Sequence, residues 1–411
     1  MTATTRSVPV IDFDHHSERF ARDLEGRAHN LLDHPIAYTE SNGGHYVVTS
    51  HELARQVLLD PETYCSGRTA DGGGGLFIPS FPIPLPGGAL LPAESDPPRH
   101  TELRKVLNPF FSRSACEAMR PQIETIVATA IDDIIAKGDF DVVYDLGHVV
   151  GPTTMMTYLG FPLDLRDRFI DAIRTGYMRK PGDDDVSDLL ELATMVYGVV
   201  NDKRANPTDD VASKLIHHDE ANFSDVELVS LLVTLLFGGF ETTESLIANT
   251  MVHLDTDRVL RRRLIDDPSL IPGAIDEFLR VITPETTTAR RVTRDVELGG
   301  VSLKEGEFIL LVLTAANHDD AVFDEPMTID PARRLSQSMA FGFGVHRCLG
   351  AIITKIESVA ILEQLLARIP DYSLHMDRAK RFPDLSAANG WLSIPASTNQ
   401  PTGPRQTVFK S

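Results

Sequence analysis

Residues 341–350 read FGFGVHRCLG and combine residue types that can hold a metal-containing group. The chain has only three cysteines, Cys65, Cys116 and Cys348, and the last lies in this loop, just before a long apolar segment. A thiolate binds iron strongly, and it forms more easily near a helix N-terminus, where free N–H groups favour negative charge. Glycines let the backbone lie flat against a large planar group. We therefore expect Cys348 to be a metal ligand, the alternative being a buried structural cysteine beside a tight turn.

A second candidate lies at residues 238–244, GGFETTE, in the middle of an apolar segment. Each glycine inside a helix costs about 1 kcal/mol relative to alanine, so the pair indicates a kink or a ligand against the backbone. An acid among apolar residues is unfavourable unless it is solvated or paired. Glu241 followed by Thr242 favours a proton-delivery pair at a helix break. The alternative is a surface acid beside a threonine that only fills the helix.

Two further pairs carry less information by themselves. Glu277 and Arg280 share one helix face, which is typical of an exposed ion pair of small energetic value. His100 and Arg104 also point the same way and can grip a carboxylate or phosphate, or form a solvated basic face.

Helical periodicity dominates the elements that must position these residues. Helices are expected at residues 17–32, 51–60, 224–254 and about 348–369, the third begun by a capping box of Ser224 and Glu227. A strand is expected at 45–50 and a hairpin or meander at 290–313, around a Gly-Gly turn. The sequence thus predicts a mainly α protein with small β-sheets, whose few short strands lie mainly near the two ends of the chain.

The segment 66–92 is rich in glycine and proline, which excludes regular structure, and also in Leu, Phe and Ile. A long loop of this kind inside a compact chain is usually functional or mobile. Its apolar content favours a lid over an apolar pocket, with part of residues 76–91 facing the pocket. A disordered linker is the alternative, although linkers are rarely so apolar.

Bulk composition excludes several classes of protein. The net charge of −20 over 411 residues argues against a nucleic-acid binder, which normally has a basic face. The N-terminus has no apolar run of signal-peptide length, and no uninterrupted run of 18 apolar residues predicts a membrane span. An odd, sparse set of cysteines is no disulfide framework, so we expect a reducing, cytoplasmic compartment.

Taken together, these motifs resemble those of the cytochrome P450 family, the heme-thiolate monooxygenases. The family pattern Phe-Gly-x-Gly-x-His/Arg-x-Cys-x-Gly is met at every specified position of residues 341–350. The patterns Ala/Gly-Gly-x-Asp/Glu-Thr, Glu-x-x-Arg and His-x-x-x-Arg match residues 238–242, 277–280 and 100–104. The resemblance covers residues 34–395 or so.

This resemblance implies the cytochrome P450 fold, with heme buried between the long central helix and the cysteine-loop helix. It implies an N-terminal segment and first helix at 1–33. Residues 34–411 are then expected to form a single heme-thiolate monooxygenase domain with no fused reductase.

The resemblance also assigns roles to individual residues. Cys348 is expected to bind the iron of heme b (iron protoporphyrin IX), and Glu241 and Thr242 to be catalytic. Structural roles are implied for Glu277 and Arg280, together with Arg333 or Arg334. The expected cofactor-binding residues are His100, Arg104, Gly238, Arg290 (or its neighbour Arg291), Phe341, Gly342, His346 and Gly350. The expected substrate-binding residues are Thr234, Phe237, Gly238, Thr286, Thr287, Ala387 and Ala388.

Three positions depart from the common family pattern. Lys355 stands where an arginine is frequent, and His318 replaces the arginine of an Asn-Arg-Asp triplet. Glu285 stands where an apolar residue is common, which argues against a wholly apolar substrate at that wall.

The implied function is hydroxylation of a small, largely hydrophobic organic substrate with dioxygen and two electrons. The expected partners are a ferredoxin and a ferredoxin reductase, with no nucleic acid and no membrane. A local basic face for the ferredoxin is expected from Arg104, Lys105, Arg113, Arg347 and Lys355. The alternatives are oxidative coupling, peroxide-driven oxidation, a non-catalytic heme sensor and a metal-free helical binding protein.

Overall fold

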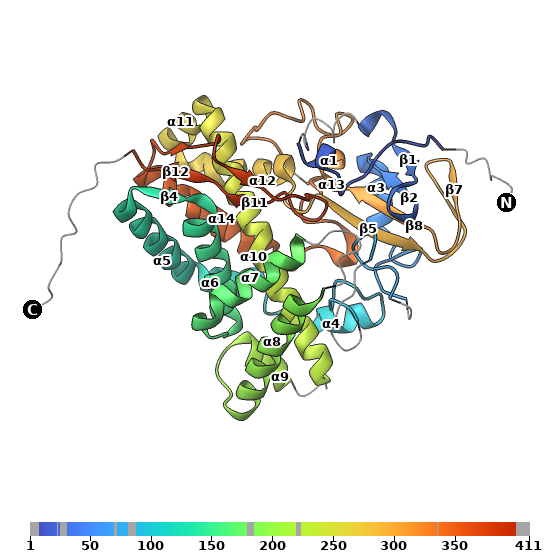
Figure 1. The fold of residues 1–411 in the computed structure, drawn as a ribbon, viewed down its shortest axis with the longest axis horizontal. Helices are drawn as coiled ribbons and strands as arrows, with labels where there is room; N and C mark the ends of the chain where they lie inside the picture. The colour runs from blue at the N-terminus through green and yellow to red at the C-terminus, as the bar shows by residue number, and fades with distance from the viewer. Residues whose placement is uncertain are drawn as a thin grey trace, which may run out of the picture.

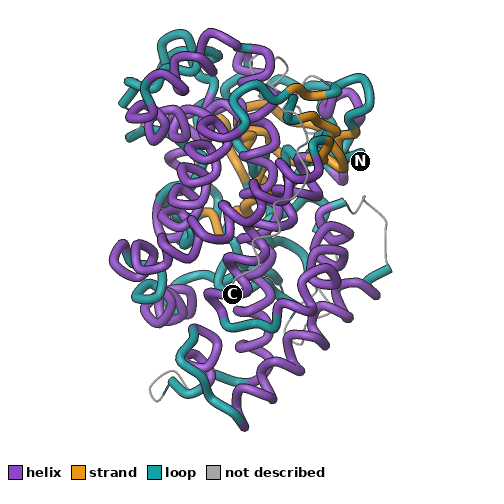
Figure 2. The backbone as a smooth tube through the Cα atoms, turned by 90° about the vertical axis from the view of Figure 1, so that its left-hand side faces the viewer, coloured by secondary structure: helices purple, strands orange, loops and turns teal. Residues whose placement is uncertain are grey.

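Helices form most of the protein, and the short strands lie in separate groups toward two sides of it (Figures 1 and 2). The computed structural model describes residues 8–22, 24, 31–69, 72–80, 88–178, 185–218, 223–334 and 336–399. The described helices are α1 (Glu18–Arg22), α3 (His51–Leu59), α4 (Arg99–Leu107), α5 (Arg113–Lys137), α6 (His148–Leu159), α7 (Arg166–Tyr177), α8 (Ser187–Ala205), α9 (Val211–Ile216), α10 (Asp225–Thr256), α11 (Arg258–Asp266), α12 (Ile271–Ile282), α13 (Leu313–Asn317) and α14 (Ala351–Arg368). The expected mainly α class with small sheets is confirmed.

Helix α10 is the central element of the fold (Figure 1). Ser224 and Glu227 form the predicted capping box at its start, and the helix then runs without a break for 32 residues, about 48 Å at 1.5 Å per residue. By length and composition it could cross a membrane, but 67% of its most apolar 18-residue window is buried in the protein. Its apolar composition therefore belongs to a core helix.

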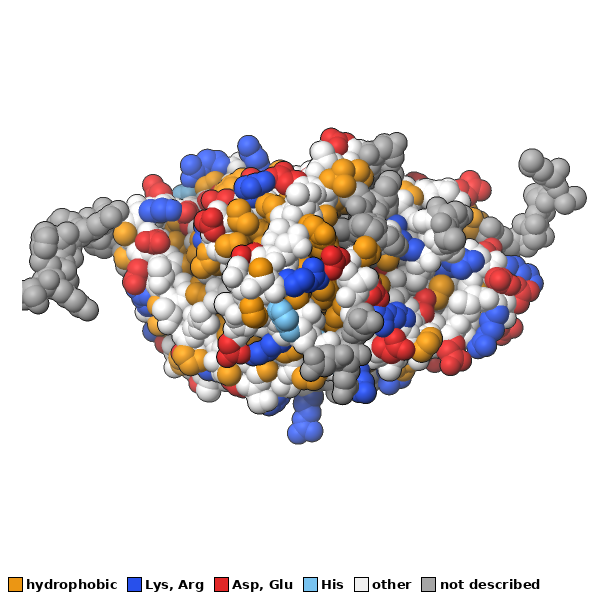
Figure 3. Space-filling model, turned by 90° about the horizontal axis from the view of Figure 1, so that it is seen from below, with side chains coloured by type: hydrophobic (Ala, Val, Ile, Leu, Met, Phe, Trp, Pro, Cys, Tyr) orange, Lys and Arg blue, Asp and Glu red, His pale blue; other side chains and the backbone are white. Residues whose placement is uncertain are grey.

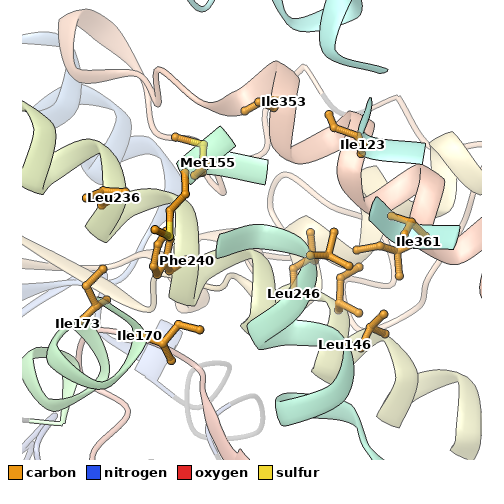
Figure 4. Packing of buried hydrophobic residues seen from close by; sticks show 14 of the residues in the cluster. Ile123, Leu146, Met155, Ile170, Ile173, Leu236, Phe240, Leu246, Ile353 and Ile361 are labelled. Carbon is orange, nitrogen blue, oxygen red and sulfur yellow. The ribbon is translucent and has the colours of Figure 1, made fainter. Parts of the chain in front are cut away.

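Other helices surround α10 and bury its side chains. Helices α6, α7 and α8 pack against one part of it, and α12 and α14 pack against another. In the close-up of this core, Met155 of α6 lies beside Phe240 of α10, with Ile173 of α7 nearby (Figure 4). Each fully buried large apolar side chain contributes about 1.5–3 kcal/mol relative to an exposed one. This packing fixes the position of α10, which forms one wall of the site described below.

The largest sheet has five strands in the order β1-β2-β8-β5-β3, with β2 and β8 parallel and the other neighbours antiparallel. It joins residues 36–65 to residues 287–312, so internal strands contribute more than the sequence suggested. The strands are β1 (Ile36–Thr39), β2 (His45–Val48), β3 (Tyr64–Cys65), β4 (Asp139–Asp141), β5 (Thr287–Val292), β6 (Val296–Leu298), β7 (Val301–Leu303), β8 (Phe308–Val312), β9 (Ser373–Leu374), β10 (Lys380–Arg381), β11 (Trp391–Ser393) and β12 (Pro395–Ser397).

Most local predictions are confirmed. Strand β2 and helix α3 lie where the sequence placed them, and β6 and β7 form a hairpin around Gly299 and Gly300, both at positive φ. Of the helix expected at 17–32, the structure describes α1 and a 3-10 turn at Leu31–Asp33, while residues 23 and 25–30 lie outside the described part. The last long helix begins at Ala351, three residues after Cys348.

On the face shown in Figure 3, acidic and basic side chains are interspersed around hydrophobic ones, so this face has no large area of charged side chains of one sign.

Candidate active site

A cavity separates α10 from the cysteine loop. It brings together most of the residues that the sequence singled out, although they come from distant parts of the chain. The predicted site residues that line it are His100, Arg104, Thr234, Phe237, Gly238, Thr242, Arg290, Phe341, Gly342, His346, Cys348, Gly350 and Ala387.

The cysteine loop is held in shape by backbone contacts. The Cys348 N–H donates to the Phe341 carbonyl at 2.8 Å, which closes the loop on itself. Gly344 has φ +71°, and a Cβ there would lie 2.4 Å from the Leu58 carbonyl oxygen, so only glycine fits. Gly342, at φ +63°, has open space where a Cβ would be, and this space is part of the cavity.

Cys348 is the one cysteine of the three whose side chain is open to a cavity; Cys65 and Cys116 are buried. The surrounding protein shields the thiol from bulk water, and this raises its pKa above the ordinary value. A metal cation reverses that preference, because a coordinating thiol is deprotonated.

The opposite wall is formed by α10 around Gly238. A Cβ at Gly238 would have no atom within 4 Å, whereas Gly239 faces Met155. The Thr242 hydroxyl donates to the Gly238 carbonyl at 2.8 Å and lies at the cavity. Because α10 is unbroken, the predicted helix break is wrong. Gly238 instead removes a side chain, so that a ligand can approach the helix backbone closely.

Glu241 lies behind this wall rather than in it. Its side chain is buried and its Oε1 has no hydrogen-bond partner in the described structure. Glu244, one turn further along, is also buried and lies 3.1 Å from the His148 ring nitrogen, which in turn contacts Arg174. Burial raises the pKa of both carboxyl groups, and the charge of Glu244 raises that of Glu241 further. The surface-acid alternative for Glu241 is therefore wrong.

Cation-forming side chains gather at one edge of the cavity. The rings of His100 and His346 are 4.2 Å apart, and buried atoms His100 Nδ1 and His346 Nε2 have no partner in the described structure. Burial and neighbouring arginines lower the pKa of His100 to about 4 and of His346 to about 2, and burial lowers that of Arg290 to about 10. Arg104 donates to the Arg347 carbonyl at 3.0 Å. Such a cluster suits an anionic ligand with carboxylate groups.

Glu277 and Arg280 form a fully buried ion pair, so the exposed-pair alternative is wrong. Arg280 Nε and Nη2 donate to the two Glu277 oxygens at 2.7 and 3.0 Å, and both side chains are 0% exposed. Arg333 Nε donates to Glu277 at 3.0 Å, which decides between Arg333 and Arg334. Arg280 Nη1 also donates to the Asn317 carbonyl at 2.9 Å. The network joins α12 to the segment that precedes the cysteine loop.

Three of the predicted substrate-binding residues do not reach the cavity. Thr286 and Thr287 do not line the cavity, because both hydroxyls donate to the Ser386 carbonyl, at 2.8 and 2.6 Å, and both side chains are buried. Ala388 is likewise buried away from the cavity, with its neighbour Ala387 at the wall. The residues of this segment that do reach the cavity are Pro284, Glu285 and Thr288.

The expected lid is anchored at both ends by a buried acid. Glu94 Oε1 accepts from the Leu76 N–H at 3.2 Å, and Oε2 accepts from the Leu90 N–H at 2.9 Å. Arg68 pairs with the same carboxylate at 2.8 and 2.9 Å. Leu76 and Leu90 both line the cavity, as the lid prediction requires. Residues 81–87 lie outside the described part.

Sequence reasoning missed several residues of the site. Tyr177 of α7 lines the cavity, and its ring stacks on Phe237 at 4.2 Å. His148, which contacts Glu244, and Arg174, which contacts His148, also carry no recognisable motif. The only signal for Arg174 in the sequence is that this arginine lies among apolar residues of a helical segment.

The residues around the cavity fit a heme group. One wall offers a thiol, the other offers bare helix backbone at Gly238, and the edge offers arginine and histidine side chains that form no ion pair in the described structure. This donor set matches a planar, dianionic, iron-containing macrocycle held by one cysteine. The fold and site therefore define a heme-thiolate protein.

Comparison with known proteins identifies the family. The model described as "Cytochrome P450" matches residues 267–400. The chain is 30% identical to cytochrome P450 107B1 of Saccharopolyspora erythraea, over 90% of this chain and 92% of that protein. It is 32% identical to the mycinamicin IV hydroxylase/epoxidase of Micromonospora griseorubida, over 85% and 88% of the two chains. The chain belongs to the cytochrome P450 family and is a heme-iron monooxygenase.

Solved structures agree with this assignment. The crystal structure of CYP109E1 from Bacillus megaterium in complex with testosterone superimposes with a TM-score of 0.84, at 25% identity, over 93% of this chain and 100% of that one. The expected P450 fold is confirmed.

A matched pair of variants tests the role of the two glycines of α10. Gly238→Ala is expected to keep or raise the unfolding temperature, because alanine adds up to about 1 kcal/mol of helix propensity, while lowering heme or substrate affinity by filling the cavity. Gly239→Ala is expected to cost about 1–3 kcal/mol, because its Cβ would lie 2.4 Å from Met155 Cγ. Thermal unfolding and heme titration measure both. Equal responses of the two variants would contradict this assignment.

Proposed function

We propose that this monooxygenase hydroxylates a small, largely hydrophobic organic molecule that carries a polar handle. The observation that carries the proposal is that Cys348 and Thr242 line opposite walls of one cavity. Most of the remaining lining is apolar, including Leu76, Leu90 and Leu235, with a few hydroxyl groups among them. Such a composition suits a hydrophobic body held in orientation by a few polar contacts.

The cofactor in this proposal is heme b, with Cys348 as the iron ligand. Heme iron with a thiolate ligand supplies dioxygen activation and oxygen insertion into a C–H bond. His100, Arg104, Arg290 and His346 are proposed to bind the two propionates, since they surround one edge of the cavity and form no ion pair among the described residues. Phe341, Gly342, Gly350 and Gly238 are proposed to contact the macrocycle.

Glu241 and Thr242 are proposed to deliver protons. The Thr242 hydroxyl is at the cavity, while Glu241 is buried behind it, and burial raises the pKa of its carboxyl group, so that it holds its proton more readily than a solvated acid does. An acid that holds its proton, next to an alcohol that faces the reaction site, is suited to general acid catalysis. Glu277 and Arg280 are proposed to keep the cysteine loop in position.

Electrons are proposed to come from a separate ferredoxin and its reductase. Arg113, Lys105 and Arg347 are exposed and suit an acidic partner. Lys355 contributes less than its charge suggests, because its ammonium pairs with Asp276 at 2.5 Å.

Residues 34–411 are proposed to act as one heme domain, supported by a continuous core that spans α4 to β12. A cytoplasmic location is proposed, supported by the absence of paired cysteines, all three of which are free.

The direct test is a screen of small hydrophobic compounds for a low- to high-spin Soret shift of the holoenzyme, followed by product analysis with dioxygen, NADPH and a surrogate ferredoxin system. Hydroxylated products of the compounds that shift the spectrum are expected. Coupled dimers, turnover only with peroxide, or binding without turnover would each replace this proposal with the corresponding alternative.

Thr242→Ala is expected to uncouple the reaction. NADPH consumption continues, but the yield of hydroxylated product per NADPH falls by about tenfold or more, with hydrogen peroxide in its place, because the proton-donating hydroxyl is gone. Thr256→Ala is the matched control, since Thr256 makes the same bond to the carbonyl four residues earlier but lies at the exposed end of α10. Full coupling in Thr242→Ala would exclude this role.

A further inference from the structure

Glu285 places a carboxylate inside the cavity. Its neighbours Pro284 and Thr286 are buried, whereas the Glu285 side chain is open to the cavity that it lines. The backbone is fixed there, because Glu285 forms a β-bridge with Ala388 and the next N–H, of Thr286, donates to the Ala387 carbonyl at 3.2 Å. The acid is therefore held in place at the wall and is not part of a loose loop.

No side chain in the described part of the protein pairs with this carboxylate. Arg290 is the nearby cation, but it lies beyond ion-pair distance and donates instead to the Ala289 carbonyl at 2.6 Å and to Thr288 at 3.3 Å. In the holoenzyme, Arg290 also belongs to the group that faces the heme propionates. A carboxylate shielded from water needs a compensating donor or cation, and here only the contents of the cavity can provide it.

Aromatic rings share the cavity with this acid. Tyr177 and Phe237 stack at 4.2 Å with their planes 15° apart, and both line the cavity. Burial raises the pKa of Tyr177, and the charge of Glu285, which lines the same cavity, raises it further. A carboxylate together with aromatic rings is the combination that recognises alkylated ammonium groups.

We propose that Glu285 determines specificity by binding a tertiary or quaternary ammonium group on an otherwise hydrophobic substrate. This rests on the proposed function, because it takes the same cavity as the substrate site. The polar handle of the substrate is then a positively charged group that lies beside Glu285.

The test compares two alkyl compounds of equal chain length, one ending in trimethylammonium and the other in its neutral tert-butyl isostere. A quaternary nitrogen has no lone pair, so it cannot bind iron. Calorimetric titration of the holoenzyme is expected to give about tenfold tighter binding of the cation, and Glu285→Gln is expected to reduce this preference to about twofold or less. Glu297→Gln, at the exposed residue of strand β6, is the control and keeps the wild-type ratio.

The preference is also expected to depend on pH. Burial raises the pKa of Glu285 to about 7, so the carboxylate is charged above that pH and the cation affinity rises from pH 6 to pH 8. The titratable or charged groups that face Glu285 are Arg290, Tyr177 and Cys348. All three remain in Glu285→Gln, so that variant removes only the contribution of the Glu285 carboxyl group to the pH dependence. His100 and His346 at the far edge are retained in that variant, but their lowered pKa values of about 4 and about 2 lie below this range, so a slope that survives in Glu285→Gln contradicts the role of Glu285.

Equal affinity of the wild-type holoenzyme for the two compounds overturns the proposal, as does a cation preference that survives in Glu285→Gln. If Glu285→Gln yields no holoenzyme, the wild-type ratio and its pH dependence decide alone. The ferrous carbon monoxide spectrum separates this failure from failure of the proposed function. A thiolate-type spectrum with no charge preference overturns only the role of Glu285, whereas loss of that spectrum in the wild type overturns the heme-thiolate assignment of the site.

Discussion

Replacement of Cys348 by serine is expected to remove the thiolate spectrum and to lower monooxygenase turnover by more than about 100-fold. Loss of a residue that only supports a metal ligand costs up to about 100-fold, and loss of the ligand itself should cost more. Serine keeps the size of the side chain but provides no thiolate. Neither of the other cysteines can take its place, because Cys65 is in strand β3 and Cys116 is buried in α5.

The measurement is the absorption spectrum of the reduced protein under carbon monoxide, together with NADPH-dependent product formation. Cys116→Ala is the control: it can lower stability because Cys116 is fully buried, yet it leaves the thiolate spectrum unchanged. A thiolate-type Soret band in Cys348→Ser would show that another ligand holds the iron.

Glu277→Ala is expected to give the largest loss of stability, about 3–5 kcal/mol in the free energy of unfolding. The change removes the carboxylate that pairs with Arg280 and Arg333, and it leaves the Arg280 guanidinium charged at a site with no exposure. Contacts of Arg280 with the Asn317, Pro326 and Thr328 carbonyls remain, but they supply no negative charge.

Urea unfolding followed by circular dichroism measures this loss, and heme content shows whether the cysteine loop is displaced. The matched control is Asp266→Ala, which breaks the exposed Arg262–Asp266 pair on α11. That change should cost no more than about 1 kcal/mol. Equal losses in the two variants would mean that the Glu277 network does not stabilise the fold.

Sequence predicted those features that are encoded locally. The capping box at Ser224, the Gly-Gly hairpin and the cysteine loop each depend on residues close together in the chain, so their types and spacing carry the information. The edge cluster of His100, Arg104 and His346 followed from the resemblance, and the structure brings these residues together at one cavity.

Features set by long-range packing could not be predicted from the residues alone. Glu277 and Arg280 have the spacing of an exposed pair, and only the burial of α12 reverses that interpretation. The resemblance to the family places Thr286 and Thr287 at the cavity. Their hydroxyls are instead taken by Ser386, about 100 residues away, a contact that no local pattern encodes.

The Glu94 carboxylate has a consequence for how this enzyme can change its substrate range. Since this carboxylate accepts hydrogen bonds from the backbone at both Leu76 and Leu90, the two ends of the expected lid stay fixed whatever residues join them. Lengthening a loop between fixed ends costs little, about 0.6 kcal/mol for each doubling. A longer or shorter connection between these two ends is therefore a route to altered selectivity that keeps Leu76 and Leu90 in place at the cavity, and natural divergence has the same freedom.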